Sequence, residues 1–320
     1  MLSAAREIRI DGKVIARTPT VVPSFSSKGF PDVAHIIEVL SQTITECALV
    51  SAYDVAHQHI TSVPTYPEYL ILDSGGYECS KDMELSDNRN NNYVEVSWTL
   101  DQLTKVLDDW TATQPTLAVS YDHPKHRVAI KDQIARAHDL FKGRKFGREI
   151  LLKPHSQEAA RINVDEIVES IYDLRSFDVI GFTEKELGYS IFDRMQKIAR
   201  IRNELTKIGL ETPIHIFGSL DTISTPLYFF SGADIFDGLT WLRYSYVDGH
   251  AVYQKNAAAL KYGIRINDRD IDPKIWFENY QQIINLEFAM RRYLKEENFS
   301  AFKEHAGFFE QSVNELKAAL

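Results

Sequence analysis

Several aspartates stand where short apolar runs end, and the clearest case is the stretch ILDSGGYE, residues 71–78. An apolar run of this kind is typical of a buried strand. The glycine pair that follows, Gly75 and Gly76, is typical of a sharp turn where backbone comes close to another group. Asp73 is therefore expected at the end of a buried strand, and as a single carboxylate it has an ordinary explanation as a helix cap.

The ends of other apolar runs supply more groups of this type. They are Asp54, Asp122 with His123, His155, Thr183 with Glu184, Gly218 and Asp237. Carboxylates that converge in a pocket with little water repel one another, so a cluster of three or more indicates a bound substrate or a reaction that offsets the repulsion. Two carboxylates on a barrel are also sufficient for the hydrolysis of a glycosidic bond.

The elements that must position these groups are β-rich apolar runs that alternate with segments of helical periodicity. Strands are expected at 20–25, 47–54, 69–76, 116–122, 149–155, 178–183, 213–219 and 234–241, with helices such as 99–110, 127–141 and 190–207 between them. This alternation predicts right-handed βαβ units and a parallel sheet, and eight strands predict a closed (β/α)8 TIM-type barrel. The carboxyl ends of such strands form the active face, so the carboxylates should meet there.

Two segments depart from a minimal barrel, and the first is a polar insertion at 86–98, after the third strand. It is expected to form a loop or small hairpin on the active-site side. The second is the end of the chain, where 273–296 and 299–319 have the pattern of amphipathic helices rich in aromatic residues. These helices either close the barrel or offer a surface for a homodimer or a partner protein. We assign residues 1–262 to the catalytic barrel and 263–320 to a helical extension.

Two helical faces are expected to be apolar. In the helix at 190–207 the core stripe is Ile191, Met195, Ile198 and Leu205, and in the last helix one face carries Phe302, His305, Phe309, Val313 and Leu316. Such stripes at helical spacing usually pack against the rest of the fold.

Composition narrows the class of protein. The 320 residues are 44% hydrophobic and 25% charged, as in an ordinary soluble globule. The start of the chain has no apolar signal region and no later segment reaches the length of a membrane span, so we expect a cytoplasmic protein. The net charge of -9 argues against a generally basic nucleic-acid surface and leaves a local basic patch open.

Cysteine and histidine usage gives no metal or cofactor site. Cys47 and Cys79 are the two cysteines of the sequence, which excludes a multi-disulfide scaffold and a cysteine-rich zinc site. The histidine pairs His57 with His59 and His123 with His126 have no third and fourth ligand at convincing spacing. We expect no metal and no cofactor.

Five segments resemble, in order, motifs of the tRNA-guanine transglycosylase superfamily. DSGGYE (73–78) is similar to DSGGFQ, VSYDHP (119–124) to an FDECTP-type segment, VIGFTEKELG (179–188) to a GGLAVGE-type loop, IHIFGSLD (214–221) to an LMGVGTPED-type turn, and GADIFDGLTWLR (232–243) to GVDMFDCVLPTR. The resemblance covers about residues 69–243 and follows the predicted barrel strands.

The resemblance implies a (β/α) barrel that exchanges guanine in a nucleic acid for a free 7-deazaguanine base through a covalent glycosyl-enzyme, which makes it a pentosyltransferase. Asp237 would be the nucleophile and Asp73 the general acid and base. Asp122 would accept hydrogen bonds from the guanine edge. The remaining substrate-binding residues implied are the stacking aromatics Tyr77 and Phe217 (a methionine in the family), then Ser74, Gly75, Gly76, Gly181 and Gly218 near base and sugar, and Arg243 at a phosphate.

The sequence also departs from the family. No cysteine follows Cys79, so the zinc subdomain that supports RNA binding and dimer formation is missing or replaced by the C-terminal helices. Where the family has a glutamine-bearing GIVQGG-type segment, this chain has ILLKPHSQ with Lys153 and His155. The family has a divergent branch that places 7-deazaguanine in DNA. A compact form without zinc slightly favours that branch and DNA over tRNA, while the replacement base and the oligomeric state stay open.

Two other functions compete with base exchange. The chain could be a catalytically silent accessory or scaffold subunit of the same family, against which the presence of both Asp73 and Asp237 argues. It could also be a glycoside hydrolase that uses two barrel carboxylates. Asp122 and the aromatic pair Tyr77 and Phe217 favour a purine over a sugar.

Overall fold

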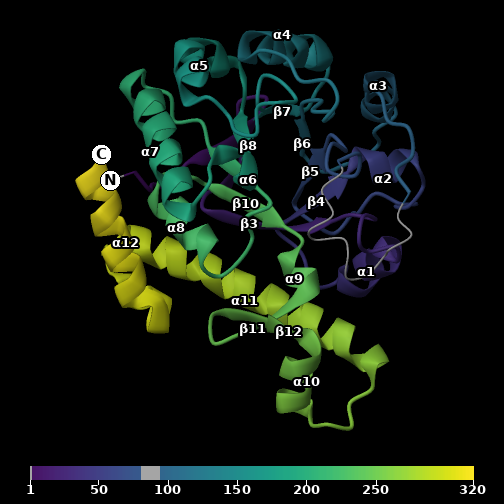
Figure 1. The fold of residues 1–320 in the computed structure, drawn as a ribbon. Helices are drawn as coiled ribbons and strands as arrows, with labels where there is room; N and C mark the ends of the chain where they lie inside the picture. The colour runs from purple at the N-terminus through teal and green to yellow at the C-terminus, as the bar shows by residue number, and fades with distance from the viewer. Residues whose placement is uncertain (1, 81–93) are drawn as a thin grey trace.

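The computed structural model describes residues 2–80 and 94–320 of the chain. Within them, eight parallel strands form a closed barrel in the order β10-β3-β4-β5-β6-β7-β8-β9 (Figure 1). The barrel strands are β3 (Thr20–Phe25), β4 (Cys47–Ser51), β5 (Tyr69–Asp73), β6 (Thr116–Val119), β7 (Gly147–Leu152), β8 (Val179–Thr183), β9 (Ile214–Phe217) and β10 (Ile235–Gly238). The predicted TIM-type barrel is confirmed, and each of its strands lies within or close to a predicted run.

Helices lie outside the strands and cover the barrel (Figure 1). Those of the barrel region are α1 (Val33–Leu40), α2 (Ala52–Ala56), α3 (Leu100–Asp108), α4 (Ile130–Phe141), α5 (Val164–Glu169), the 3-10 helix η1 (Ile171–Ser176), α6 (Glu184–Leu187), α7 (Ile191–Lys207), α8 (Ser224–Phe230) and α9 (Thr240–Arg243). After the barrel come the hairpin β11 (Tyr244–Val247) and β12 (His250–Tyr253), α10 (Gln254–Tyr262), α11 (Asp268–Glu296), the 3-10 helix η2 (Phe299–His305) and α12 (Ala306–Ala319).

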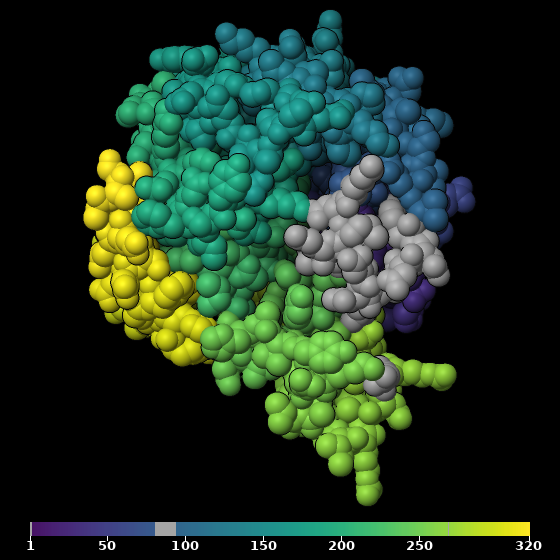
Figure 2. Space-filling model, viewed as in Figure 1, coloured from purple at the N-terminus to yellow at the C-terminus, as the bar shows by residue number. Residues whose placement is uncertain are grey.

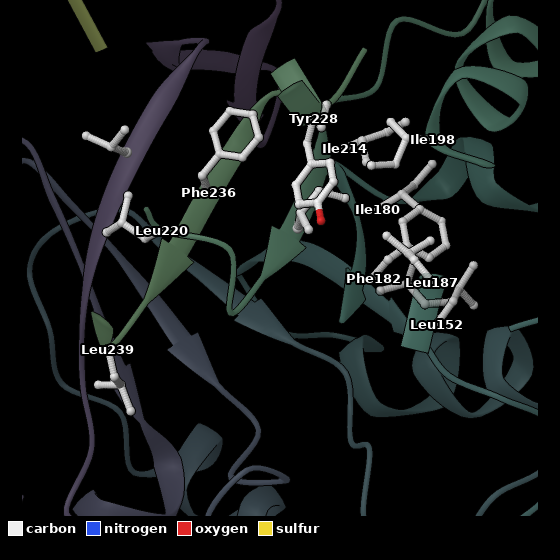
Figure 3. Packing of buried hydrophobic residues seen from close by; sticks show 14 of the residues in the cluster. Leu152, Ile180, Phe182, Leu187, Ile198, Ile214, Leu220, Tyr228, Phe236 and Leu239 are labelled. Atoms are coloured by element: carbon white, nitrogen blue, oxygen red, sulfur yellow. The ribbon is translucent and has the colours of Figure 1, made fainter. Parts of the chain in front are cut away.

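The strands are almost continuously apolar because both of their faces are buried. Alternate residues of β8, β9 and β10 point outward, and Ile180, Phe182, Ile214 and Phe236 pack there in the large core cluster. Figure 3 shows them beside side chains from the surrounding helices, among them Tyr228 of α8, Ile198 of α7 and Leu187 of α6. The other residues of each strand point into the barrel and form a second, smaller cluster.

An antiparallel hairpin at the start of the chain closes the amino-terminal end of the barrel. Its strands are β1 (Glu7–Ile10) and β2 (Lys13–Arg17), joined by Asp11 and Gly12 with φ of 50° and 75°. Ile8 and Ile10 join the cluster inside the barrel. This hairpin is not among the elements predicted above, although an Asp-Gly pair between alternating apolar residues is a strong hairpin signal.

The C-terminal helices pack against the barrel. α11 runs past β3, where Glu287 accepts a hydrogen bond of 2.9 Å from the Val21 amide, and α12 lies against α7 and α8 (Figure 1). The aromatic face of the extension is buried at Phe302, Phe309, Val313 and Leu316, and its rings meet Phe230 of α8. The expectation that these helices close the barrel is confirmed for that face.

Three smaller expectations have different outcomes. Met195, Ile198 and Leu205 are buried as predicted, but Ile191 is 39% exposed because it is the first residue of α7, at the rim. Of the predicted insertion, 86–93 lies outside the described residues, and 94–99 form neither helix nor strand. Across the described chain, no helix combines the length and apolarity that a membrane crossing requires.

Part of the chain projects beyond the barrel. The β11–β12 hairpin and α10 form a lobe at the lower edge of the molecule (Figures 1 and 2). The two ends of the chain lie near each other beside α7 and α12 (Figure 1).

A buried ion cluster ties the N-terminal segment to the barrel. Asp234 accepts hydrogen bonds of 2.8 Å from Arg6 and 2.6 Å from Arg202, and a third of 2.8 Å from the Ile214 amide. All three charged side chains are at most 6% exposed. Burial lowers the pKa of Arg202 to about 10, against the attraction of Asp234.

Removing Asp234 should therefore cost far more than removing an exposed carboxylate. We expect Asp234→Ala to lower the free energy of unfolding by about 3–5 kcal/mol, because the buried guanidinium of Arg202 loses its paired carboxylate and that of Arg6 is left with the exposed Glu211. Asp165→Ala, which breaks the exposed ion pair with Arg200, should change it by about 1 kcal/mol or less. Chemical denaturation of the two variants measures both values, and equal losses would contradict the role of Asp234.

Candidate active site

The inward-pointing residues at the carboxyl ends of the strands open onto one cavity of about 640 Å³. Side-chain alternation places Asp73 at the end of β5, Phe217 at the end of β9 and Asp237 within β10 on the inside of the barrel. Asp122, in the segment after β6, reaches the same cavity. Of the carboxylates predicted to meet at this face, Asp73, Asp122, Glu184 and Asp237 line the cavity, whereas Asp54 does not and accepts hydrogen bonds from the amide and hydroxyl of Ser27.

Asp73 is held by the turn that follows it. Its carboxylate accepts a hydrogen bond of 3.2 Å from the Gly75 amide, and the φ of +89° at Gly75 is one that glycine adopts readily. The side chain of Asp73 is buried, and burial together with the charges of Asp122 and Glu78 raises its pKa well above the usual value. A carboxyl group in this state can donate a proton near neutral pH.

Asp122 is positioned from three sides. Ser74 donates a short hydrogen bond to its Oδ1, and Lys153 Nζ lies 3.2 Å from its Oδ2. A Cβ atom at Gly76 would lie 2.2 Å from Oδ1, so the absence of a side chain there is what admits the carboxylate. Gly76 therefore positions Asp122 as well as lining the cavity.

Lys153 is a cavity residue whose role the sequence analysis leaves open. Besides Asp122, its ammonium group contacts Glu186 Oε2 at 3.0 Å and donates to the Thr183 hydroxyl. Burial alone would lower the pKa of Lys153, but Glu186 and Asp122 outweigh it and raise the pKa. Lys153 is thus a cation at neutral pH beside Asp122. Its neighbour His155 points elsewhere and pairs with Glu166 at 3.0 Å.

Asp237 accepts hydrogen bonds from two sides of the barrel. Ser24 of β3 donates to Oδ2 at 2.6 Å, and the Gly218 amide donates to Oδ1 at 3.1 Å. His215 of β9 places Nε2 3.2 Å from the same Oδ1, and its Nδ1 lies 2.7 Å from Oε1 of Glu149 on β7. Glu149 and His215 are fully buried. Neither residue is predicted as a site residue from the sequence: Glu149 stands inside an apolar strand, and His215 lies within the IHIFGSLD segment, whose resemblance implies no role for it.

The two predicted stacking residues line the cavity, each backed by another group. Lys28 Nζ lies 4.6 Å from the centre of the Tyr77 ring and donates to the Tyr77 carbonyl at 2.8 Å. The Phe217 ring stacks on His215 with 3.9 Å between centroids and 27° between planes. Lys28 therefore contacts the Tyr77 ring, and His215 the Phe217 ring.

Glu78, the last residue of the opening motif, also lines the cavity. Its carboxyl oxygens accept hydrogen bonds of 2.5 Å from Ser26 and 2.9 Å from Ser51. Burial and the neighbouring Asp54 raise the pKa of Glu78 to about 7. The motif predicts the position of this residue but no role for it.

Four predicted substrate-binding residues do not line the cavity. Ser74 and Gly75 act on Asp122 and Asp73, as described above. Gly181 lies behind Phe217, where a Cβ atom would be 2.6 Å from the ring. Arg243 is buried in α9, with its guanidinium 4.9 Å from the centre of the Phe30 ring. The charged residues that do line the cavity on the β6 and β8 side include Arg127, Lys185 and Arg194.

Among the described residues, one group of side chains has the composition of a metal site. Cys79, Glu95 and His123 bring one ligand atom each within 4.8 Å of the others, a donor set that suits zinc. His123 Nδ1, however, accepts a hydrogen bond of 3.2 Å from the Lys125 amide, and Glu95 pairs with the Lys125 ammonium at 3.4 Å. These internal contacts compete with a metal, so the cluster gives no support for a resident ion.

No model in a scan of protein families matches this chain, and no match is found among curated proteins. The likeness to the transglycosylase superfamily therefore depends on the five sequence motifs and on where their residues lie around the cavity.

The raised pKa of Glu78 predicts a pH dependence of stability. The folded state keeps the Glu78 proton up to about pH 7, whereas the unfolded chain releases it near the ordinary value of 4.5. Folding is therefore favoured by protons, and the stability that Glu78 contributes is lost as the pH rises through this range. Between pH 4.5 and 7, Glu78 should lower the free energy of unfolding of the wild type by on the order of 2–3 kcal/mol. Glu78→Gln should not show this decrease.

Urea denaturation at several pH values measures this effect. The control is Glu38→Gln, because the Glu38 side chain is 84% exposed, and it should follow the wild-type curve. A Glu78→Gln curve parallel to that of the wild type would show that Glu78 is not a protonated, buried carboxyl group.

Proposed function

We propose that the chain is a base-exchanging transglycosylase, a pentosyltransferase that replaces guanine in a nucleic acid with a free 7-deazaguanine base. The observation that supports this most is that Asp73, Asp122 and Asp237 line one cavity together with Tyr77 and Phe217. A volume of about 640 Å³ suits a purine with its attached sugar. Each of these five residues belongs to one of the motifs that resemble the superfamily.

The proposed reaction uses two carboxyl groups in different protonation states. A carboxylate oxygen of Asp237 attacks the anomeric carbon of the sugar and forms a C–O bond, while the bond from that carbon to the purine nitrogen breaks and its electron pair stays on the base. Asp73, whose pKa is raised by burial and by Asp122 and Glu78, donates its proton to the departing base. In the second half-reaction, a nitrogen of the incoming base gives its proton to Asp73 and bonds to the anomeric carbon while the bond from that carbon to Asp237 breaks, so no further reactant is needed.

Asp122 and Lys153 together match the edge of guanine. Guanine presents an acceptor, O6, next to the N1–H and N2–H donors. The carboxylate of Asp122 can accept from these donors, and Lys153, 3.2 Å from it, supplies a donor for O6. In the same orientation, adenine would place its position-6 donor against Lys153 and its N1 acceptor against Asp122, so both contacts would be repulsive. The pair therefore favours guanine and its 7-deaza analogues.

Duplex DNA is the polymer that we favour. A paired guanine has to be flipped out of the duplex, at a cost of a few kcal/mol that stacking on Tyr77 and Phe217 would offset. Backbone contacts would come from cations at the cavity such as Arg127, Lys185 and Arg194, which makes binding fall steeply with salt.

Incubation with radiolabelled guanine and either duplex DNA or tRNA tests the function and the polymer together. We expect label in the DNA. Label in tRNA alone would contradict the choice of polymer and support base exchange. Label in neither polymer, from protein shown to be folded, would contradict the proposed function.

Two isosteric substitutions should separate base binding from chemistry. Asp122→Asn loses the charged acceptor, so guanine affinity should fall by roughly 1.5–3 kcal/mol, the usual contribution of a hydrogen bond to a charged group. Asp237→Asn should abolish exchange while guanine still binds, because the base-reading edge is intact. Calorimetric titration with guanine measures the affinities, and an unchanged affinity in Asp122→Asn would contradict the role of this residue.

A further inference from the structure

The side chains of Glu149 and His215 lie buried behind Asp237, inside the barrel. We propose that they are positioning residues that keep Asp237 ionised and oriented, so that it serves as both nucleophile and leaving group in glycosyl transfer. This inference rests on the proposed function. It concerns residues outside the family motif that contains Asp237, one of them on β7 and the other on β9.

The three groups form a continuous chain of contacts. Glu149 Oε1 lies 2.7 Å from His215 Nδ1, and His215 Nε2 lies 3.2 Å from Asp237 Oδ1. The exposed fractions of Glu149 and His215 are 0%, and that of Asp237 is 6%. Water is therefore not available to compensate the inner carboxylate, and Glu149 Oε2 has no hydrogen-bond partner among the described residues. His215 Nδ1 is therefore the group that stabilises the Glu149 carboxyl group through a contact of 2.7 Å.

Gly181 is what allows Glu149 to reach His215. The two residues stand on β7 and β9, with β8 between them, and Gly181 of β8 is in register with His215. A Cβ atom at Gly181 would lie 3.2 Å from Glu149 Oε1 and 2.6 Å from the Phe217 ring. A side chain there would push against both groups. Gly181, which the family resemblance places near the bound guanine, therefore leaves room for the contact between Glu149 and His215 across β8.

Two carboxyl groups, one beside each ring nitrogen of His215, favour the form in which both nitrogens carry protons, the imidazolium. The charged groups that act on the ring are Glu149 from β7 and Asp237 from β10. Burial alone would lower the pKa of His215, but these two carboxylates raise it to about 9. The ring is therefore a fixed cation at neutral pH, and it is held flat against Phe217 by stacking.

A cation next to Asp237 has a specific use in an exchange reaction. It makes the carboxylate a weaker nucleophile and a better leaving group, because it stabilises the free anion relative to the glycosyl ester. Base exchange needs the bond between Asp237 and the anomeric carbon to form with the first base and break with the second. The hydrogen bonds from Ser24 and the Gly218 amide support the same state of the carboxylate.

The first test follows the pH dependence of glycosyl-enzyme formation in a single turnover with a guanine-containing duplex. A carboxylate that loses a neighbouring cation is less stable in its charged form. We expect the acidic limb of the rate profile to move up by at least one pH unit in His215→Asn and in Glu149→Gln. Breakdown of the glycosyl-enzyme by excess guanine should become at least tenfold slower in both variants, because Asp237 becomes a poorer leaving group. A loss of correctly folded protein would lower the amplitude without moving the limb.

The matched control is the exposed pair of His155 and Glu166, whose contact is 3.0 Å. His155→Asn and Glu166→Gln make the same chemical changes outside the cavity, and both should keep the wild-type profile. An acidic limb at the wild-type pH in the two buried variants overturns the inference.

The second test does not depend on activity. In protein with ¹⁵N-labelled histidine, the His215 ring, identified by its absence in His215→Asn, should stay doubly protonated up to about pH 9. Glu149→Gln, which keeps the shape of the side chain, should lower this titration. If wild-type His215 titrates below pH 7, the inference fails even when base exchange occurs. If no polymer accepts label but the ring titrates as expected, the proposed function fails, whereas the charged state of His215 between Glu149 and Asp237 is supported.

Discussion

The compensation of buried carboxylates is the constraint on which this candidate site depends. Asp54, Asp73, Glu78, Asp122, Glu149 and Asp237 lie in or next to the barrel mouth with little access to water. Lys153 pairs with Asp122, and His215 lies beside Glu149 and Asp237, while burial disfavours the ionised forms of Asp73 and Glu78. The structure divides these carboxyl groups into two kinds by the charges next to them. Asp122 and Asp237 have cations beside them, whereas Asp73 and Glu78 have neighbouring carboxylates and raised pKa values.

This division matches the two duties that glycosyl transfer requires, one anionic nucleophile and one proton donor. Glycoside hydrolysis needs the same pair, so the carboxylates alone do not separate the two functions. The separation comes from the walls of the cavity. Lys153 beside Asp122 matches a guanine edge, and Tyr77 and Phe217 offer rings to a flat base. A silent scaffold protein would have no need of the buried side chains of Glu149 and His215 behind Asp237.

Much of this arrangement is predictable from the sequence, because the barrel strands are apolar runs that end in polar residues. Asp73, Asp122 and Asp237 can be assigned to one face since the carboxyl ends of parallel strands meet there. Glu149 and His215 cannot be found this way: they stand inside strands, and a contact across β8 through Gly181 leaves no trace in spacing along the chain. The role of Arg243 illustrates the reverse case, since a motif position does not reveal that α9 turns the side chain toward Phe30.

The covalent intermediate on Asp237 is the central claim, and peptide mapping tests it most directly. Protein mixed with a guanine-containing duplex is denatured rapidly and digested, and its peptides are analysed by mass spectrometry. The proposed mechanism predicts a nucleotide-derived mass on the peptide that contains Asp237, and the loss of that mass when excess free guanine is added before denaturation. An adduct on a peptide that contains Asp73, or free guanine released with no adduct on any peptide, would contradict the assignment of Asp237 as the nucleophile.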